Sequence, residues 1–406
     1  MLALSGLALA ARFVIVLMYV HTTPVADFWT FGFEPSHIAA ALVRGFGFSS
    51  PFTDHSGPTA WIPPAYPWLI AAAFKVFGIY SAGALWFMLA LNLVCATLTA
   101  AVIYLIGLRC FSPEIAFGGA FLWAASPDAV AMSVRIWDIG PATLLGALLV
   151  LWYLRVVQPE ARPRDWMIYG TLWGVSALVS TTLLAMMPLA MIVLFLHDRG
   201  RMRRQTALAV GIAILIMLPW TIRNYAQFGR LIPIRGNFGA ELWAGNHPGV
   251  QGPSDESLHP LKSEEELNAY LTMGESKYMA VCQRQATTFI RQNPRPFAVL
   301  TRERILSFWT APLVMTSAWP IGCSVLAWVS TILLLVRRAT RLVAVPFAAA
   351  MFFFPFSYYI SHAESYFRSP IEPLISLLTA YGFFTCLERI SARGTAASAA
   401  SSLPDS

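Results

Sequence analysis

The chain has 406 residues, of which 57% are apolar and only 12% charged, and its mean hydropathy is +0.60. A soluble domain of this composition would have to bury an unrealistic share of its surface, so composition excludes an ordinary water-soluble protein. The net charge of +7 does not indicate nucleic-acid binding, because the basic residues lie in short loops between apolar runs. The five cysteines form no CxxC motif, so neither a disulfide framework nor a zinc site is indicated.

Apolar runs recur along the whole chain and are near the length that a helix needs to cross a membrane. A hydrocarbon core offers no water to unpaired backbone groups, so each spanning run must be helical. We therefore expect an all-α polytopic membrane protein with about ten spanning helices (range ~9–12). The expected spans lie near 2–20, 81–106, 114–132, 138–156, 165–181, 183–197, 206–222, 319–336, 342–360 and 369–387. The first run has no basic residues before it, which favours a retained helix over a cleaved signal peptide.

Arginines divide the connecting loops into two groups. With the spans above, the arginine-bearing short loops all fall on one side, and the positive-inside rule makes that side cytoplasmic. These arginines are Arg109, Arg155, Arg162, Arg164, Arg199, Arg201, Arg203, Arg204, Arg337, Arg338, Arg341, Arg389 and Arg393. The long polar segments 22–80 and 223–318 then lie outside, the C-terminus lies in the cytoplasm, and a bacterial inner membrane is the expected location.

This topology gives four parts. They are an N-terminal transmembrane module at 1–222, which includes the outer loop 22–80, an extracytoplasmic segment at 223–318, C-terminal transmembrane helices at 319–390 and an Ala/Ser-rich, disordered tail at 391–406.

The two outer segments contain helices of their own. Glu34 to Val43 reads as a short helix ended by Gly45, and Pro64 to Phe77 is an apolar run too short to span, as expected of an interfacial helix. In the second segment, Glu264 to Arg291 has helical spacing, whereas 229–260 is rich in Gly, Pro and Asn and reads as loop.

Carboxylates and arginines gather at the outer ends of the expected helices. A carboxylate can take a proton from an attacking hydroxyl, and an arginine can hold a phosphate with two parallel hydrogen bonds. The candidate catalytic acids are Asp27, Glu34 and Asp138, with Asp128 beside the same turn as Asp138. The candidate phosphate-binding residues are Arg223, Arg235 and Arg368. We expect the three acids to meet around a cavity, with Arg368 on its rim.

Four stretches resemble the GT-C superfamily of polytopic glycosyltransferases, in particular the branch of the dolichyl-phosphate-mannose mannosyltransferases, the lipid A aminoarabinose transferases and the Rgt-type transferases. They are Ile38-Ala39 to Ser49, Pro58 to Pro67 with Phe77-Gly78, Pro219-Trp220 to Gly245-Asn246, and Arg368-Ser369-Pro370-Ile371-Glu372-Pro373. They follow one another in the expected order along the whole chain. Tyr66, Asn237 and Asn246 lie within them and are the candidate substrate-binding residues.

The resemblance implies a transferase that moves a sugar from a polyprenyl-phosphate donor to a hydroxyl of a lipid, glycan or protein at the extracytoplasmic face, with inversion of the anomeric centre. It also implies an acid in the first outer loop, which is Asp27 or Glu34, and a second in the next outer turn, which is Asp138 or Asp128. Asp27 ranks above Glu34, because Glu34 doubles as the N-terminal charge of its helix. No DxD motif is present, so neither a metal nor another cofactor is indicated.

Simpler interpretations stay open for each of these residues. Asp27 and Glu34 also fit the role of acids in a solvated loop without catalytic function. Arg223 and Arg368 also fit the role of anchors at the membrane interface. His247 and His259 are a weak metal signal. The competing functions are a lipid or glycan transporter or flippase, an O-antigen-type ligase or polymerase, and a non-catalytic scaffold. A transporter would favour helices broken near the membrane midplane and an internal repeat, and no repeat is seen.

Overall fold

The computed structural model describes residues 2–30, 33–197, 200–253, 255–310 and 319–401. This part of the chain is helical, apart from loops and an isolated bridge between Ser49 and Pro58. The elements in chain order are α1 (Leu2–Thr22), α2 (Val25–Phe28), α3 (Phe33–Val43), α4 (Ala65–Phe77), α5 (Ala82–Cys110), α6 (Pro113–Ala124), α7 (Pro127–Ala131), η1 (Met132–Val134), α8 (Ile139–Val156), α9 (Pro163–Val179), η2 (Thr181–Met186), α10 (Met187–His197), α11 (Arg201–Phe228), α12 (Phe238–Gly245), α13 (Glu264–Met273), α14 (Glu275–Gln292), α15 (Pro294–Thr310), α16 (Trp319–Val336), α17 (Arg341–Ala348), η3 (Ala349–Phe353), α18 (Phe356–Ile360), η4 (Ser365–Ile371) and α19 (Glu372–Ser401).

Seven helical stretches in the described residues are long and apolar enough to cross a membrane, and a bent pair, α6 with α7 and η1, makes an eighth. The expectation of an all-α polytopic protein is confirmed. The expected number of about ten is higher than this. The difference lies at 165–181 and 183–197, where α9 has 17 residues and Thr181–His197 is a shorter apolar helix. The chain is extended at Ser180 (φ −147°, ψ 106°), which ends α9 before it reaches spanning length.

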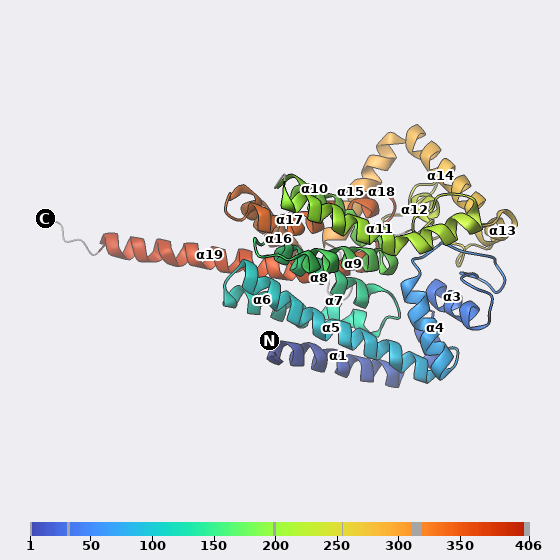
Figure 1. Ribbon diagram of the computed structural model, residues 1–406, viewed down its shortest axis with the longest axis horizontal. Coiled ribbons are helices and arrows are strands. Elements are labelled where there is room, and N and C mark those ends of the chain that lie inside the picture. The colour runs from blue at the N-terminus through green and yellow to red at the C-terminus, as the bar shows by residue number, and fades with distance from the viewer. Residues whose placement is uncertain (1, 31–32, 198–199, 254, 311–318, 402–406) are drawn as a thin grey trace.

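The spanning helices pack closely where small residues meet. A side chain at Gly170 of α9 would put its Cβ 2.4 Å from the carbonyl oxygen of Ala209 in α11, so only glycine permits this approach. The largest buried apolar cluster extends through α5, α6, α8, α9 and α19. In Figure 1 the long helices lie roughly side by side, and the C-terminal half of α19 extends beyond the others.

The two polar segments meet at one end of this bundle (Figure 1). Buried Glu275 of α14 joins them, because its carboxylate accepts hydrogen bonds from the Thr59 hydroxyl and from the Ala60 N–H at 2.6 Å. Arg223 at the end of α11 donates to the carbonyl oxygens of Thr59 and Phe48, both at 2.7 Å. The first outer loop is therefore fixed between α11 and α14.

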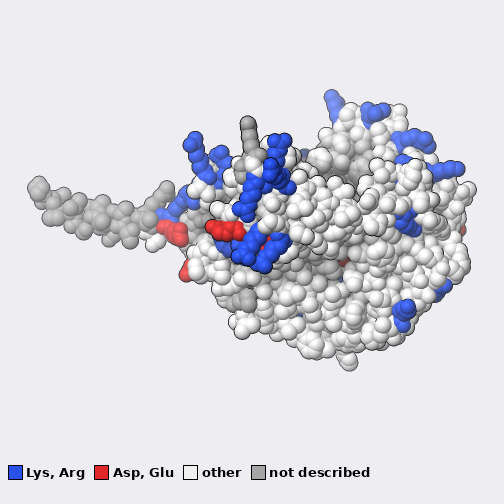
Figure 2. All heavy atoms as spheres, viewed as in Figure 1, with Lys and Arg blue, Asp and Glu red and all other residues white. Residues whose placement is uncertain are grey.

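Arginines gather at the other end. Figure 2 shows Lys and Arg side chains crowded near α10 and α17. Arg201 donates to the Pro159 carbonyl at 3.0 Å, and Arg155 lies 3.3 Å from Asp165. Arg199 lies outside the described residues. The separation of polar segments from arginine-rich loops agrees with the sequence pattern.

Helices occupy two regions where the sequence indicated none. The 229–260 region contains α12, whose N-terminus follows Asn237 and whose small residues pack against α14. The tail continues α19 as far as Ser401, although disorder was predicted from residue 391. Alanine has the highest helix propensity of all residues, and the Ala-rich composition that suggested disorder also supports a continued helix.

Candidate functional site

A cavity of about 520 Å³ opens among the outer ends of the helices. Its walls come from five regions that the sequence places on one side: the first outer loop, the turn before α8, the break at 180–182, the segment 233–260 and the region 357–370. The polar side chains that line it are Glu34, Tyr66, Asp138, Ser180, Thr181, Thr182, Arg235, Asn237, Glu241, Glu256, Ser357, Tyr358, Ser361, His259, His362 and Tyr366. Trp61, Trp137 and Phe238 add aromatic surface.

Glu34 enters the cavity from α3 and pairs with His259. The His259 Nε2 lies 3.2 Å from Glu34 Oε1, and the backbone N–H of Leu261 donates to His259 Nδ1 at 3.2 Å. Because Nδ1 accepts a hydrogen bond, the neutral ring must carry its proton on Nε2 and donate it to Glu34. Burial by itself lowers the pKa of His259, but the hydrogen bond and charge of Glu34 raise it above its ordinary value. The pair therefore fixes the orientation of one carboxylate oxygen.

A second cluster of polar groups centres on Glu241 of α12. Its Oε1 accepts from Arg235 Nη2 at 2.8 Å and also from the Asn237 amide, while its Oε2 lies 3.2 Å from His362 Nδ1. Arg235 further donates to the Trp61 carbonyl at 3.0 Å. Among the described residues that line the cavity, Arg235 is the only lysine or arginine. It is the one fixed positive charge that the wall offers to a bound anion.

Asp138 stands immediately before α8 on another wall. Burial disfavours its charge more than a hydrogen bond from Ser180 and the charge of Arg235 favour it, and this raises the pKa of Asp138 to about 6. Tyr66, at the start of α4, is buried and its hydroxyl has no partner among the described residues. Both groups therefore have hydrogen-bonding capacity left for a ligand in the cavity.

Two predicted site residues, Asp27 and Arg223, do not line the large cavity. Asp27 is exposed on α2 and lines neither cavity. Its expected place beside Glu34 and Asp138 is wrong, because α2 exposes the Asp27 side chain to solvent. The Arg223 guanidinium donates to carbonyls of the first outer loop and stacks on aromatic rings. Its Cζ lies 4.8 Å from the centre of the Trp220 ring. Arg223 holds that loop in place and does not reach the cavity.

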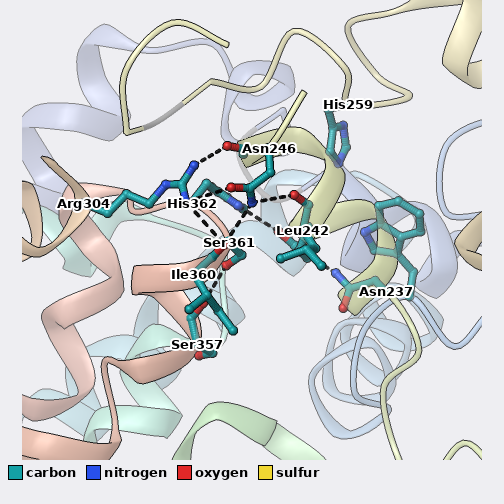
Figure 3. A network of polar contacts seen from close by, with 12 residues as sticks. Asn237, Leu242, Asn246, His259, Arg304, Ser357, Ile360, Ser361 and His362 are labelled. Carbon is teal, nitrogen blue, oxygen red and sulfur yellow. Dashed lines mark hydrogen bonds and ion pairs between the residues drawn. The ribbon is translucent and has the colours of Figure 1, made fainter. Parts of the chain in front are cut away.

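Asn246 is a third residue whose position differs from the prediction. It is fully buried between α12 and the turn after α18. Its amide donates to the carbonyls of Leu242 at 2.8 Å and Ile360 at 2.9 Å (Figure 3). Buried Arg304 of α15 donates to Asn246 Oδ1 at 3.3 Å and also to the Gly245 carbonyl. Asn246 thus connects three elements behind the cavity wall that carries His362.

Arg368 lines a separate, smaller cavity of about 40 Å³ with Arg12, Asp128, Asn92 and Glu372. It donates to the Trp309 carbonyl and the Ser324 hydroxyl, both at 3.0 Å, and pairs with Glu372. The expected position on the rim of the large cavity is therefore wrong. Within the described ranges, no three His, Cys, Asp or Glu side chains come together as a metal site.

Sequence reasoning found Glu34, Asp138, Arg235, Tyr66 and Asn237, which do line one cavity. It missed Glu241 and His362 and considered His259 only as a weak metal ligand. The available signal was their position in the long outer segment next to Asn237 and in the turn just before Arg368. Nothing in the sequence shows that these two regions touch.

Comparison with known proteins agrees with this architecture. Residues 62–222 match the family model of the dolichyl-phosphate-mannose-protein mannosyltransferases. None of the curated proteins matches the chain in sequence. Among solved structures, the oligosaccharyltransferase AglB from Archaeoglobus fulgidus, in complex with an inhibitory peptide and a dolichol-phosphate, superposes with a TM-score of 0.52 at 12% identity, over 98% of this chain and 52% of that one. The chain therefore has the fold of this membrane oligosaccharyltransferase, and part of it matches the mannosyltransferase family model.

Two further solved structures match the chain. The apo form of the Archaeoglobus enzyme gives a TM-score of 0.53 at 11% identity, over 98% of this chain and 52% of that one. ArnT from Cupriavidus metallidurans, bound to undecaprenyl phosphate, gives a TM-score of 0.40 at 13% identity, over 89% and 77% of the two chains. The chain spans about half the length of the archaeal enzymes that it matches.

Proposed function

We propose that the protein transfers a sugar from a polyprenyl-phosphate donor to an acceptor hydroxyl at the extracytoplasmic face of the membrane. The observation that supports this best is the convergence of five regions on one cavity, which is lined by one arginine, Arg235, and by several carboxylates that include Glu34 and Asp138. The cavity lies at the end of the bundle opposite the arginine-rich loops, and by the positive-inside rule this supports an extracytoplasmic position for it. The match of residues 62–222 to the model of the dolichyl-phosphate-mannose-protein mannosyltransferases supports a lipid-linked donor.

Glu34 is the proposed general base. His259 occupies its Oε1, so Oε2 is left to accept the proton of the acceptor hydroxyl. The hydroxyl oxygen attacks the anomeric carbon, the bond from that carbon to the phosphate oxygen breaks, and the bonding electron pair leaves with the phosphate. A single displacement of this kind inverts the anomeric centre. The proton ends on Glu34.

Asp138 and Arg235 are proposed to stabilise the charges that develop on the two sides of the breaking bond. Positive charge grows on the sugar ring in an oxocarbenium-like transition state, and ionised Asp138 is suited to face it. Negative charge grows on the departing polyprenyl phosphate, and Arg235 is the fixed cation of the wall. Its pairing with Glu241 positions the guanidinium without burying it completely.

The test is transfer of radiolabelled sugar by the purified full chain in lipid nanodiscs. Polyprenyl-phosphate sugars prepared from the host membrane serve as donors, and the host's envelope glycolipids and proteins serve as acceptors. A glycolipid and glycan profile of cells with and without the gene supplies the candidates. We expect label to enter one acceptor class in a manner that depends on Glu34. Failure to transfer from any polyprenyl-phosphate donor, with an intact fold, would reject the proposal.

A transporter or flippase is the second candidate, because one spanning segment is broken. α6 and α7 meet at 51°, and buried Arg12 of α1 donates to the Ala124 carbonyl at the break. Broken helices with charged residues are typical of transporters. The space at this break is only about 40 Å³, far smaller than a sugar phosphate. Movement of a fluorescent glycolipid across vesicles by the Glu34→Gln variant would favour this alternative.

A further inference from the structure

A one-signed surface lies on the outer segment, away from the cavity. Between Glu275 and Glu303 the sequence contains five basic residues and no acidic one. They are Lys277, Arg284, Arg291, Arg295 and Arg302, and all five are exposed. None of them forms an ion pair with another described residue. We call this surface the basic ridge.

The ridge has a fixed direction because α14 is amphipathic. Lys277, Arg284 and Arg291 recur every seven residues and so share one face of the helix. The opposite face is buried through Tyr278, Met279, Cys282 and Ala286. Rotation of α14 would expose this apolar face, so the basic residues must point away from the protein. Figure 2 shows Lys and Arg side chains in a row along this edge, with no acidic group between them.

The second helix of the ridge is tied to the membrane-spanning part. The Trp309 carbonyl in the last turn of α15 accepts a hydrogen bond from Ser324 of α16 at 2.7 Å. Because α16 is a candidate span, the end of α15 lies level with the outer turns of a membrane helix. From there α15 runs back to the turn with α14, and Figure 1 shows this hairpin projecting from the side of the bundle. What lies next to such a projection is the bilayer surface.

α15 also has exposed apolar side chains. Val299 is 52% exposed, Leu306 47% and Ile305 37%. They alternate with Arg295 and Arg302, so apolar and basic groups occur on the same exposed stretch. This combination is typical of helices that rest in a membrane interface, with apolar residues at the acyl boundary and arginines among the headgroups. A soluble anionic ligand gains nothing from the three apolar groups.

We propose that the basic ridge binds anionic phospholipid headgroups of the leaflet beside it and so orients the outer segment on the membrane. The positive charges of the basic ridge lie in a row and do not enclose a pocket. Such a row is better suited to several lipid headgroups than to a single small ligand. This inference does not depend on the proposed sugar transfer, since none of its residues lines the large cavity.

The experiment measures lipid retention by the detergent-purified full chain in native mass spectrometry. Phosphatidylglycerol and phosphatidylcholine of the same chain length are the probes. The test variant is Arg284→Gln, Arg291→Gln, Arg295→Gln. The matched control removes three basic residues that already have partners: Arg44→Gln, Arg230→Gln, Lys262→Gln. Thermal unfolding of both variants confirms that they are folded.

We expect the wild type to retain phosphatidylglycerol in preference to phosphatidylcholine, and the preference to weaken as salt increases, because exposed charges are screened. The test variant should lose at least about tenfold in apparent affinity for phosphatidylglycerol, with the control within about twofold of wild type. Equal retention by the test variant and wild type would overturn the proposal. So would equal retention of the two lipids by wild type.

Discussion

The large and the small cavity hold the same kinds of side chain and use them in opposite ways. In the small cavity, Arg12 donates to the Ala124 carbonyl at 2.9 Å and lies 4.4 Å above the Trp123 ring, while Arg368 is surrounded by main-chain and side-chain acceptors. In the large cavity, Glu34 and Asp138 keep hydrogen-bonding capacity toward an open space of about 520 Å³. A charged residue at a helix end is therefore not by itself a sign of a catalytic site. A better sign is a charged residue that faces a cavity and still has hydrogen-bonding capacity for a ligand.

Amide variants of the cavity acids should show the largest effect. Loss of a general base or of a transition-state charge typically costs ~100- to 10,000-fold in turnover. We expect Glu34→Gln and Asp138→Asn each to lower the rate of sugar transfer within that range, with little change in donor binding. The measurement is single-turnover transfer of labelled sugar in nanodiscs.

The chain supplies its own matched control. Asp27→Asn makes the same chemical change on an exposed acid that lines neither cavity, so transfer should stay within about twofold of wild type. If Asp27→Asn lost as much activity as Glu34→Gln, the ranking of the first-loop acids by the sequence would be right and the assignment of the cavity wrong.

Breaking the small cavity should affect stability and leave the chemistry alone. Arg368→Gln leaves half-buried Glu372 without its partner and removes the hydrogen bond of buried Arg368 to the Trp309 carbonyl, and loss of a hydrogen bond to a charged group typically costs about 1.5–3 kcal/mol. We expect a large drop in the unfolding temperature and near-normal transfer per folded molecule. Arg44→Gln removes an exposed pair with Asp54 and should cost about 0–1 kcal/mol. A variant of Arg368 with full stability and a weakened donor affinity would restore the phosphate-binding role.

Gly245 offers a test of the buried connection behind the cavity. A Cβ at this position would lie 1.8 Å from the Ser361 carbonyl oxygen, so Gly245→Ala must push α12 away from the turn that carries His362. We expect a loss of about 1–3 kcal/mol in the free energy of unfolding, measured by thermal denaturation. Gly211→Ala is the control, because its Cβ would meet nothing within 4 Å. Equal stability of the two variants would contradict the close approach of Gly245 to Ser361.

Asp138 should show how a functional charge affects stability. Its pKa is raised to about 6 in the folded protein from a usual 3.8, so between these values the folded state holds a proton that the unfolded state has lost. Stability therefore falls as pH rises through this window and stays lower above it. We expect Asp138→Asn to raise the unfolding temperature by a few degrees at pH 8 and to make no difference at pH 4. A variant that is less stable than wild type at pH 8 would contradict this account.

The fold could be predicted further than the site, for a physical reason. Spanning length and arginine asymmetry are local properties, so they gave the all-α polytopic class and the grouping of the outer loops. Arg235 and His362 are brought to one cavity by contacts between segments more than a hundred residues apart, which no local pattern encodes. Likewise Arg223 and Arg235 look alike in sequence. What separates them is the position of the guanidinium in the fold. Arg223 donates to the Thr59 and Phe48 carbonyls away from the cavity, whereas Arg235 lies on the cavity wall.

The smallest expected effect concerns His259, which acts on Glu34 without touching the reacting atoms. His259→Phe removes the hydrogen bond to Glu34 Oε1 but keeps an aromatic ring against Phe52 and Trp61, so the wall should stay intact. We expect kcat to fall about 3- to 10-fold, because one well-placed hydrogen bond contributes on the order of 1 kcal/mol. His259→Gln retains an N–H donor near the Nε2 position and should recover part of this loss. His55→Phe, at a ring outside the cavity, is the matched control.

In the Glu34→Gln background the His259→Phe change should have no further effect on kcat, since a positioning residue has nothing to position once the base is absent. An equal loss in both backgrounds would show that His259 contributes to the structure of the wall and not to the orientation of the carboxylate.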